Sequence, residues 1–153
     1  MSRFQIDVQA SEPIEDHLVQ TLERAAALAL ERQQAAENVA LTVRLATAEE
    51  VQQLNRTYRG QDSQTDVLSF EINDTLPDGS FYLGDIVIAT EVAREQARAA
   101  GHALLDELAL LVIHGVLHLM GHDHADDAQK AAMWAQQRDV LAALGLNAMP
   151  TES

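Results

Sequence analysis

The sequence contains no cysteine. Disulfide bonds and metal sites built on thiolates are therefore excluded, and any metal ion has to be bound by nitrogen and oxygen ligands. The first 16 residues lack a basic start followed by an apolar run, and they lack a cleavage site of small residues, so they do not read as a signal peptide. We therefore expect a cytoplasmic protein.

Long apolar segments and basic residues are both scarce. The most apolar segment, residues 108–120, is too short to span a bilayer and contains two histidines, which predicts a buried helix and no membrane partner. The chain has 10 Lys and Arg residues against 24 Asp and Glu residues, a formal net charge of −14. This charge favours solubility and opposes nonspecific attraction to nucleic acid, although a local groove with a few arginines can still be positive.

The pattern of apolar residues predicts one domain with a helical carboxy-terminal half. A length of 153 residues suits a single domain over residues 1–153, and no repeat, low-complexity segment or linker suggests a second one. Alternating and apolar runs predict strands at residues 4–9, 38–47, 67–72 and 81–89. Apolar residues at helical spacing predict helices at residues 14–33, 48–59, 90–100, 102–119 and 125–144. We expect an α+β fold in which about five helices pack on a small, mixed four-stranded sheet.

Short polar motifs mark several ends of these elements. Thr47 followed by Glu50 forms a capping box that opens the second helix. Thr90 is the expected cap of the third helix. Residues 73–80, with the sequence NDTLPDGS, predict a turn between the last two strands.

Four of the six histidines lie in one stretch, HGVLHLMGHDH, at residues 114–124. His114 and His118 are four residues apart on a predicted helix, so both imidazoles project from one face with Cβ atoms about 6 Å apart. Gly121 permits a left-handed turn after the helix, which brings His122 or His124 to the same point. Three neutral imidazoles with one open position are typical of a catalytic zinc site, in which the open position holds a water molecule.

Other interpretations of this cluster are weaker. The histidines could be core residues satisfied by the neighbouring backbone, or they could bind metal adventitiously. Unpaired imidazoles inside a helix of Leu, Val and Ile would be costly, which favours the metal site. Asp123 could orient a ligand through its second ring nitrogen. Nickel or cobalt would suit three imidazoles nearly as well as zinc.

The spacing H-x-x-x-H-x-x-G-x-x-H resembles the zinc signature of the metzincin proteases, and this resemblance implies His124 as the third ligand on a metzincin-like zinc helix. Those proteases carry a glutamate, their general base, directly after the first histidine. This chain has Gly115 there. The difference argues against peptide hydrolysis by that mechanism.

A second motif, NRTYRGQDSQTDVLSF, occupies residues 55–70 and places Arg59 in a polar loop before a strand. By itself it could be a solvated turn. Together with LGDIVIA and the histidine motif, in this order and spacing, it resembles the YbeY family of zinc-dependent endoribonucleases. The resemblance covers essentially the whole chain. It implies one zinc ion bound by His114, His118 and His124, with Arg59 near the metal and serving activity.

The resemblance also implies a substrate and partners. These are single-stranded ribosomal RNA, cleaved during maturation of the 3′ end of the small-subunit RNA and in ribosome quality control, and ribosomal proteins that supplement the affinity of an acidic enzyme. The guanidinium of Arg59 suits the growing negative charge on a phosphate, because its donors match two oxygens. Ser69 is expected to line the cleft, whereas Asp66 and Asp85 are expected to cap turns.

The nucleophile and two alternative functions stay open at this point. Zinc could polarise the phosphate, supply hydroxide or activate the 2′-hydroxyl of the RNA. One alternative is a zinc hydrolase of a peptide or small amide, which a glutamate placed near the metal by the fold would favour. The other is a non-catalytic ribosome-assembly factor in which zinc only stiffens the end of the long helix.

Overall fold

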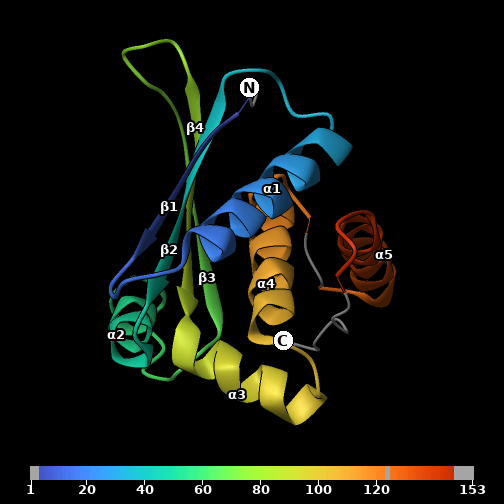
Figure 1. Cartoon of the computed structure of the whole chain (residues 1–153). Coiled ribbons are helices and arrows are strands. Elements are labelled where there is room, and N and C mark those ends of the chain that lie inside the picture. The colour runs from blue at the N-terminus through green and yellow to red at the C-terminus, as the bar shows by residue number, and fades with distance from the viewer. Residues whose placement is uncertain (1–3, 123–124, 147–153) are drawn as a thin grey trace.

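The computed structural model describes residues 4–122 and 125–146, which form four strands and five helices (Figure 1). The strands are β1 (Gln5–Ala10), β2 (Val39–Ala46), β3 (Val67–Thr75) and β4 (Phe81–Ala89). The helices are α1 (Asp16–Arg32), α2 (Ala48–Arg59), α3 (Thr90–Ala100), α4 (Leu104–Leu119) and α5 (Asp127–Ala143). The predicted α+β fold, with a four-stranded sheet and five helices, is confirmed.

The sheet is mixed, and its strand order is β1-β2-β4-β3. The pairs β1–β2 and β2–β4 are parallel, whereas β3 runs antiparallel to β4. Helix α1 joins β1 to β2, and α2 joins β2 to β3, which forms a hairpin with β4. As a result β3 is an edge strand, and one side of its backbone faces away from the sheet.

The two faces of the sheet belong to two different apolar clusters. Successive side chains of β4 point to opposite faces. Ile86 and Ile88 join the main cluster, which includes residues of α1, α4 and α5, while Val87 and Ala89 join a smaller cluster with Val51 of α2. Helices α1, α4 and α5 are accordingly on one side of the sheet in Figure 1, with α4 between the sheet and α5.

Helix α4 is the central helix of this packing, and 12 of its 16 residues are buried. Any polar side chain on it therefore has to find a partner within the protein. Within the described residues, no single helix is long and apolar enough to cross a membrane, and only α3 and α4 together, which meet at a bend of 116°, reach that length and apolar content.

The ends of the elements agree with most of the local signals. The Thr47 side chain accepts a hydrogen bond from the Glu50 backbone N–H at 3.1 Å, as a capping residue does. The predicted turn is present but covers only residues 76–80, where the Leu76 N–H donates to the Ser80 carbonyl at 2.8 Å, because β3 continues to Thr75. The prediction for Thr90 is wrong: it is the first residue of α3, and Ala89 is the N-cap. The reason is that β4 stays paired with β2 as far as Ala89, so the chain is still extended there.

Candidate functional site

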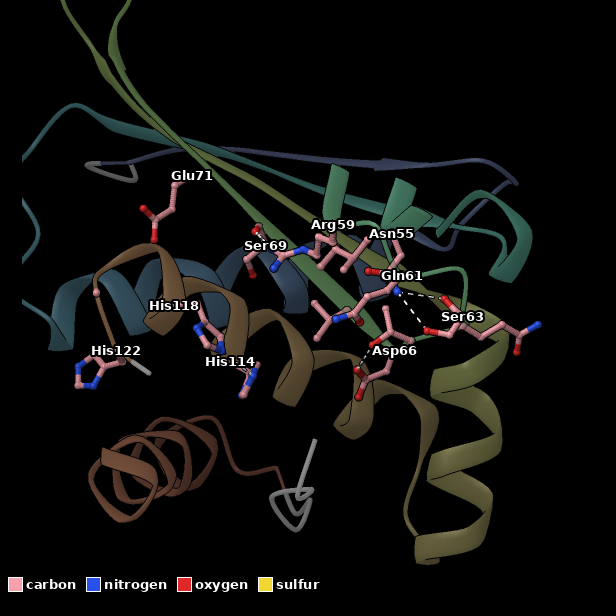
Figure 2. Close-up of a pocket in the computed structure, with 15 residues that line it drawn as sticks. Asn55, Arg59, Gln61, Ser63, Asp66, Ser69, Glu71, His114, His118 and His122 are labelled. Carbon is pink, nitrogen blue, oxygen red and sulfur yellow. Dashed lines mark hydrogen bonds between the residues drawn. The ribbon is translucent and has the colours of Figure 1, made fainter. Parts of the chain in front are cut away.

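The carboxy-terminal half of α4 brings His114 and His118 together. Their Nε2 atoms are 3.1 Å apart, and their rings meet edge to face with centroids 4.6 Å apart. His114 is 9% exposed, and both histidines line the same pocket. Figure 2 shows the two rings side by side. The predicted pairing of these imidazoles on one helix face is therefore present in the structure.

A glutamine from another helix sets the orientation of His114. Gln137 of α5 is 1% exposed, and its Oε1 lies 2.6 Å from His114 Nδ1. An amide oxygen can only accept, so Nδ1 of His114 is the donor of this bond. In the neutral imidazole, Nε2 of His114 is then left as an acceptor facing His118.

Sequence reasoning missed Gln137, although a signal was present. Met133, Gln137 and Val140 follow one another at helical spacing, and all three are buried. A glutamine on the apolar face of an amphipathic helix needs a hydrogen-bond partner in the core. The sequence alone does not say which partner it finds.

The geometry of the histidine pair fits a tetrahedral metal ion. Two nitrogens bound to tetrahedral zinc at about 2.0–2.1 Å are roughly 3.3 Å apart, close to the separation of the two Nε2 atoms. The arrangement also supplies the outer hydrogen bond that ligand histidines usually make through their second nitrogen, here from His114 to Gln137. Both imidazoles could therefore bind one ion without leaving their present positions.

The chain leaves α4 as the sequence predicted. Gly121 has a φ of 99°, a conformation that L side chains rarely adopt. His122 then turns to α1, where its Nε2 lies 2.7 Å from Gln33 Oε1, and it stands apart from the pair in Figure 2. His124 and Asp123 lie outside the described residues. Among residues 4–122 and 125–146, no group of three His, Cys, Asp or Glu side chains is placed to bind a metal.

The structure gives a physical reason for glycine at position 115. A Cβ atom on Gly115 would lie 2.7 Å from Cγ2 of Ile86, which is fully buried in β4. This position therefore faces the sheet, where α4 and β4 are in close contact, and a glutamate has no space there. The general base of the metzincin signature has no counterpart at this position.

The histidine pair opens into a pocket of about 960 Å³. The opposite wall consists of the end of α2, the loop at residues 60–66 and the edge strand β3 (Figure 2). It includes Arg59 and Ser69, which the sequence analysis placed at the site, and also Glu71, which it did not name. Two chain segments far apart in sequence, residues 55–71 and residues 114–122, thus meet at one cavity.

Arg59 is fixed at the edge of the sheet. Its Nη2 donates to the Ser69 carbonyl at 2.7 Å, and its guanidinium carbon lies 5.6 Å from the ring centroid of Phe70. In the part of the chain that the structure describes, β3 pairs with β4 alone, so its other edge is open to side chains such as that of Arg59. This bond uses one of the five N–H donors of the guanidinium.

Asn55 holds the loop that follows Arg59. Asn55 is 3% exposed, and its Nδ2 donates to the Ser63 carbonyl at 3.1 Å. Gly60 ends α2 in a left-handed conformation with φ 68°, and Gln61 N–H returns to the Asn55 carbonyl at 3.2 Å. The loop is therefore folded back on α2, which gives the pocket a defined wall.

A second buried polar cluster lies two helical turns before His114 and was not predicted. Glu107 is fully buried, and its Oε1 lies 2.6 Å from Nε2 of His102. With its amide oriented to suit both neighbours, Gln96 donates to Glu107 Oε2 at 3.0 Å and to Asp66 Oδ2 at 3.3 Å. Burial raises the pKa of Glu107, and the bond to His102 opposes this rise. Asp66, which lines the pocket, is thus tied to the interior of the protein.

Asp85, the other carboxylate of the sequence analysis, is not among the residues that line the pocket. Its Oδ1 accepts a short hydrogen bond from the Tyr82 hydroxyl. Burial and this carboxylate raise the pKa of Tyr82 to about 12. Asp85 therefore has a local partner on β4 and no place at the candidate site.

Comparison with known proteins identifies the class of this protein. A family model described as Endoribonuclease YbeY matches residues 5–145. The Endoribonuclease YbeY of Moorella thermoacetica is 40% identical over 146 residues, which cover 90% of this chain and 94% of that protein. That of Geobacillus kaustophilus is 39% identical and covers 84% of this chain and 87% of its own length. The protein therefore belongs to the class of endoribonucleases.

The fold agrees with this result. The solution structure of the Thermotoga maritima protein TM1509 has a TM-score of 0.64 and 27% identity to this chain, and the match covers 92% of this chain and 89% of that one. The chain belongs to the YbeY family. The family predicted from the three sequence motifs is therefore confirmed.

Proposed function

We propose that this protein is a single-domain, zinc-dependent endoribonuclease that cleaves single-stranded RNA. The observation that carries the proposal is the pair of Nε2 atoms, 3.1 Å apart, in a pocket that also contains Arg59. Membership of a family named for endoribonucleases supports the reaction class. We further propose that the substrate is the 3′ end of small-subunit ribosomal RNA, cleaved in maturation and in ribosome quality control.

His114, His118 and His124 would hold one metal ion, with Gln137 orienting His114 through Nδ1. When bound, zinc supplies a Lewis acid and lowers the pKa of a coordinated water to about 7. The donor set is entirely imidazole nitrogen, which nickel and cobalt also accept. Zinc is the metal we propose, because a three-histidine set with an open position is typical of catalytic zinc.

Arg59 would bind the phosphate that is cleaved. Its guanidinium is held by the Ser69 carbonyl and lies at the pocket wall, so it is already in position before RNA binds. The remaining N–H donors suit the non-bridging oxygens, on which negative charge grows as the bond breaks. A preformed donor of this kind stabilises the transition state more than the ground state.

The net charge of −14 bears on how RNA reaches the site. Overall repulsion opposes tight binding of a polyanion by the isolated protein. We therefore propose that ribosomal proteins, or the ribosome itself, contribute affinity in the cytoplasm.

Glu71 supports a second candidate function. It is a carboxylate that lines the same pocket as the histidine pair, on β3 and not at the helix position that metzincins use. A glutamate near a metal could serve as a general base in hydrolysis of a peptide or small amide. Replacing Glu71 with Gln and assaying both RNA and peptide substrates separates the two candidates, because only the second requires this carboxylate.

The test of the first proposal measures zinc content together with cleavage of a single-stranded fragment of ribosomal RNA 3′ sequence. Wild type should bind about one zinc ion and cut. His114→Ala should lose both properties, and Arg59→Glu should keep zinc while its cleavage falls by at least ~100-fold. Arg94→Glu, with the same charge change on α3, is the matched control and should behave as wild type. A zinc-loaded wild type that cuts no RNA, even with ribosomes added, would contradict the proposal and favour the hydrolase or the non-catalytic assembly factor.

A further inference from the structure

Two of the few aromatic residues meet outside the pocket, next to Arg59. The chain contains three Phe, two Tyr and one Trp. Tyr58 at the end of α2 and Phe70 on β3 form an edge-to-face pair with centroids 5.7 Å apart, which we call the aromatic pair. Tyr58 is 69% exposed, against 46% for Ile72 and 38% for Phe81. Most of the Tyr58 side chain is therefore accessible to a ligand.

The aromatic pair and the pocket lie on opposite faces of the edge strand β3. Phe70 packs with the smaller apolar cluster on the α2 side, whereas Ser69 and Glu71, its neighbours in sequence, line the pocket. Arg59 connects the two faces, because its guanidinium lies 5.6 Å from the Phe70 ring centroid and also belongs to the pocket wall. Among residues 4–122 and 125–146 no strand pairs with this edge of β3, so an extended chain can cross it.

We propose that the aromatic pair is a binding site for one unstacked nucleobase of single-stranded RNA, placed next to the phosphate bound by Arg59. This inference rests on the proposed function and adds the place where the substrate strand leaves the pocket. A base stacks on the ring of Tyr58, and Phe70 holds that ring in place through their edge-to-face contact. Stacking of this kind tolerates any base, because every base has a π face.

The site explains a preference for single strands by a physical argument. In a duplex each base is paired and stacked between its neighbours, so its face is not accessible to a side chain. A base in a single strand can turn out and stack on Tyr58 while its phosphate stays at Arg59. A duplex can present phosphates to Arg59 but no base to the aromatic pair.

Positive charge at this point favours RNA over an apolar protein partner. Arg56 and Arg59 both lie in the last turn of α2, three residues apart and hence neighbours on the helix surface. They are two of only ten basic residues in an acidic chain. Aromatic rings with a guanidinium group close by are the combination that binds single-stranded nucleic acid, and here the guanidinium carbon of Arg59 lies 5.6 Å from the Phe70 ring centroid.

The experiment measures binding of the zinc-loaded full chain to a single-stranded RNA oligonucleotide by fluorescence anisotropy at low salt. The oligonucleotide has 2′-O-methyl riboses, which prevent cleavage through the 2′-hydroxyl, and a gel run after the titration checks that it is intact. Tyr58→Ala should raise the Kd about tenfold, and Tyr58→Phe should restore the wild-type Kd because it keeps the ring. Phe81→Ala removes an aromatic that is 38% exposed at the far end of the β3–β4 hairpin, and it should change nothing. An abasic oligonucleotide of the same length should bind wild type and Tyr58→Ala equally.

The outcomes separate this inference from the proposed function. The nucleobase site is wrong if Tyr58→Ala leaves the Kd unchanged or weakens binding of the abasic oligonucleotide equally. It is also wrong if Tyr58→Ala weakens only binding to ribosomal proteins, or if wild type binds no RNA. A Tyr58-dependent Kd in a protein that cuts no cleavable RNA keeps the nucleobase site and overturns the nuclease. If wild type cleaves RNA and the Kd does not depend on Tyr58, the nuclease proposal is kept and the nucleobase site is overturned.

Discussion

Helix α4 carries two buried polar clusters on one side, two turns apart, and they differ in one respect. Glu107 is closed in by His102 and Gln96, which give both of its oxygens a partner inside the protein. His114 and His118 face each other and a pocket. A buried cluster whose members satisfy one another stabilises the fold, whereas one that opens into a cavity is available to a ligand. The same helix therefore serves as a structural support at one end and as a candidate metal site at the other.

The largest effect that tests this comparison is expected at the closed end. Glu107→Ala leaves His102 and Gln96 without their buried acceptor, so the free energy of unfolding should fall by roughly 3–5 kcal/mol. Zinc binding per folded molecule should not change. Denaturant unfolding and metal titration of the same preparation measure both quantities.

A matched control for Glu107→Ala is Glu95→Ala. Glu95 pairs with Arg98 on the surface of α3, where the two side chains are 65% and 74% exposed. Its removal should cost about 0–1 kcal/mol. If Glu107→Ala kept full stability and lost zinc, the two clusters would be one functional unit and the comparison would be wrong.

A smaller effect is expected at the open end from Gln137→Leu. The variant keeps the volume of the side chain and removes the oxygen that accepts from His114 Nδ1. Loss of such a partner typically weakens metal binding by about 10–100-fold. Competition with a chelating dye measures the zinc affinity, and Gln20→Leu makes the same chemical change at an exposed position of α1 as the control. Equal affinities for wild type and Gln137→Leu would show that this bond does not prepare the ligand.

The smallest effect concerns the pH dependence of stability. Burial raises the pKa of Glu107 above its ordinary value of 4.5, so the folded protein holds this proton more tightly than the unfolded chain does. The stability that protonated Glu107 adds to the folded state is therefore fully present below the ordinary pKa. It is lost as the pH rises through the raised pKa. Glu107→Gln cannot ionise at this position. Its free energy of unfolding should therefore rise relative to that of wild type as the pH rises above about 4.5. Denaturant unfolding across this range measures the difference, and parallel curves would contradict the assignment.

The sequence predicted the fold well where the pattern was local. Strands and helices came from alternation and helical spacing, and the Thr47 cap and the turn at residues 76–80 came from side chains that act on their own neighbours. Thr90 was misjudged because pairing of β4 with β2 at Ala89, a contact between distant segments, decided where α3 begins. The position of β3 at the edge of the sheet was not predicted for the same reason.

The sequence by itself determined that His114 and His118 share a helix face, since their spacing of four residues is close to one turn, and that Gly121 can leave the helix with positive φ. Only the tertiary structure decided which side chains surround them. Gln137 is 23 residues from His114, and Arg59 comes from a different helix, yet packing places the first against the ring and the second in the same pocket. Helical periodicity follows from backbone geometry within a few residues, whereas these contacts depend on how whole elements bury their apolar faces against one another.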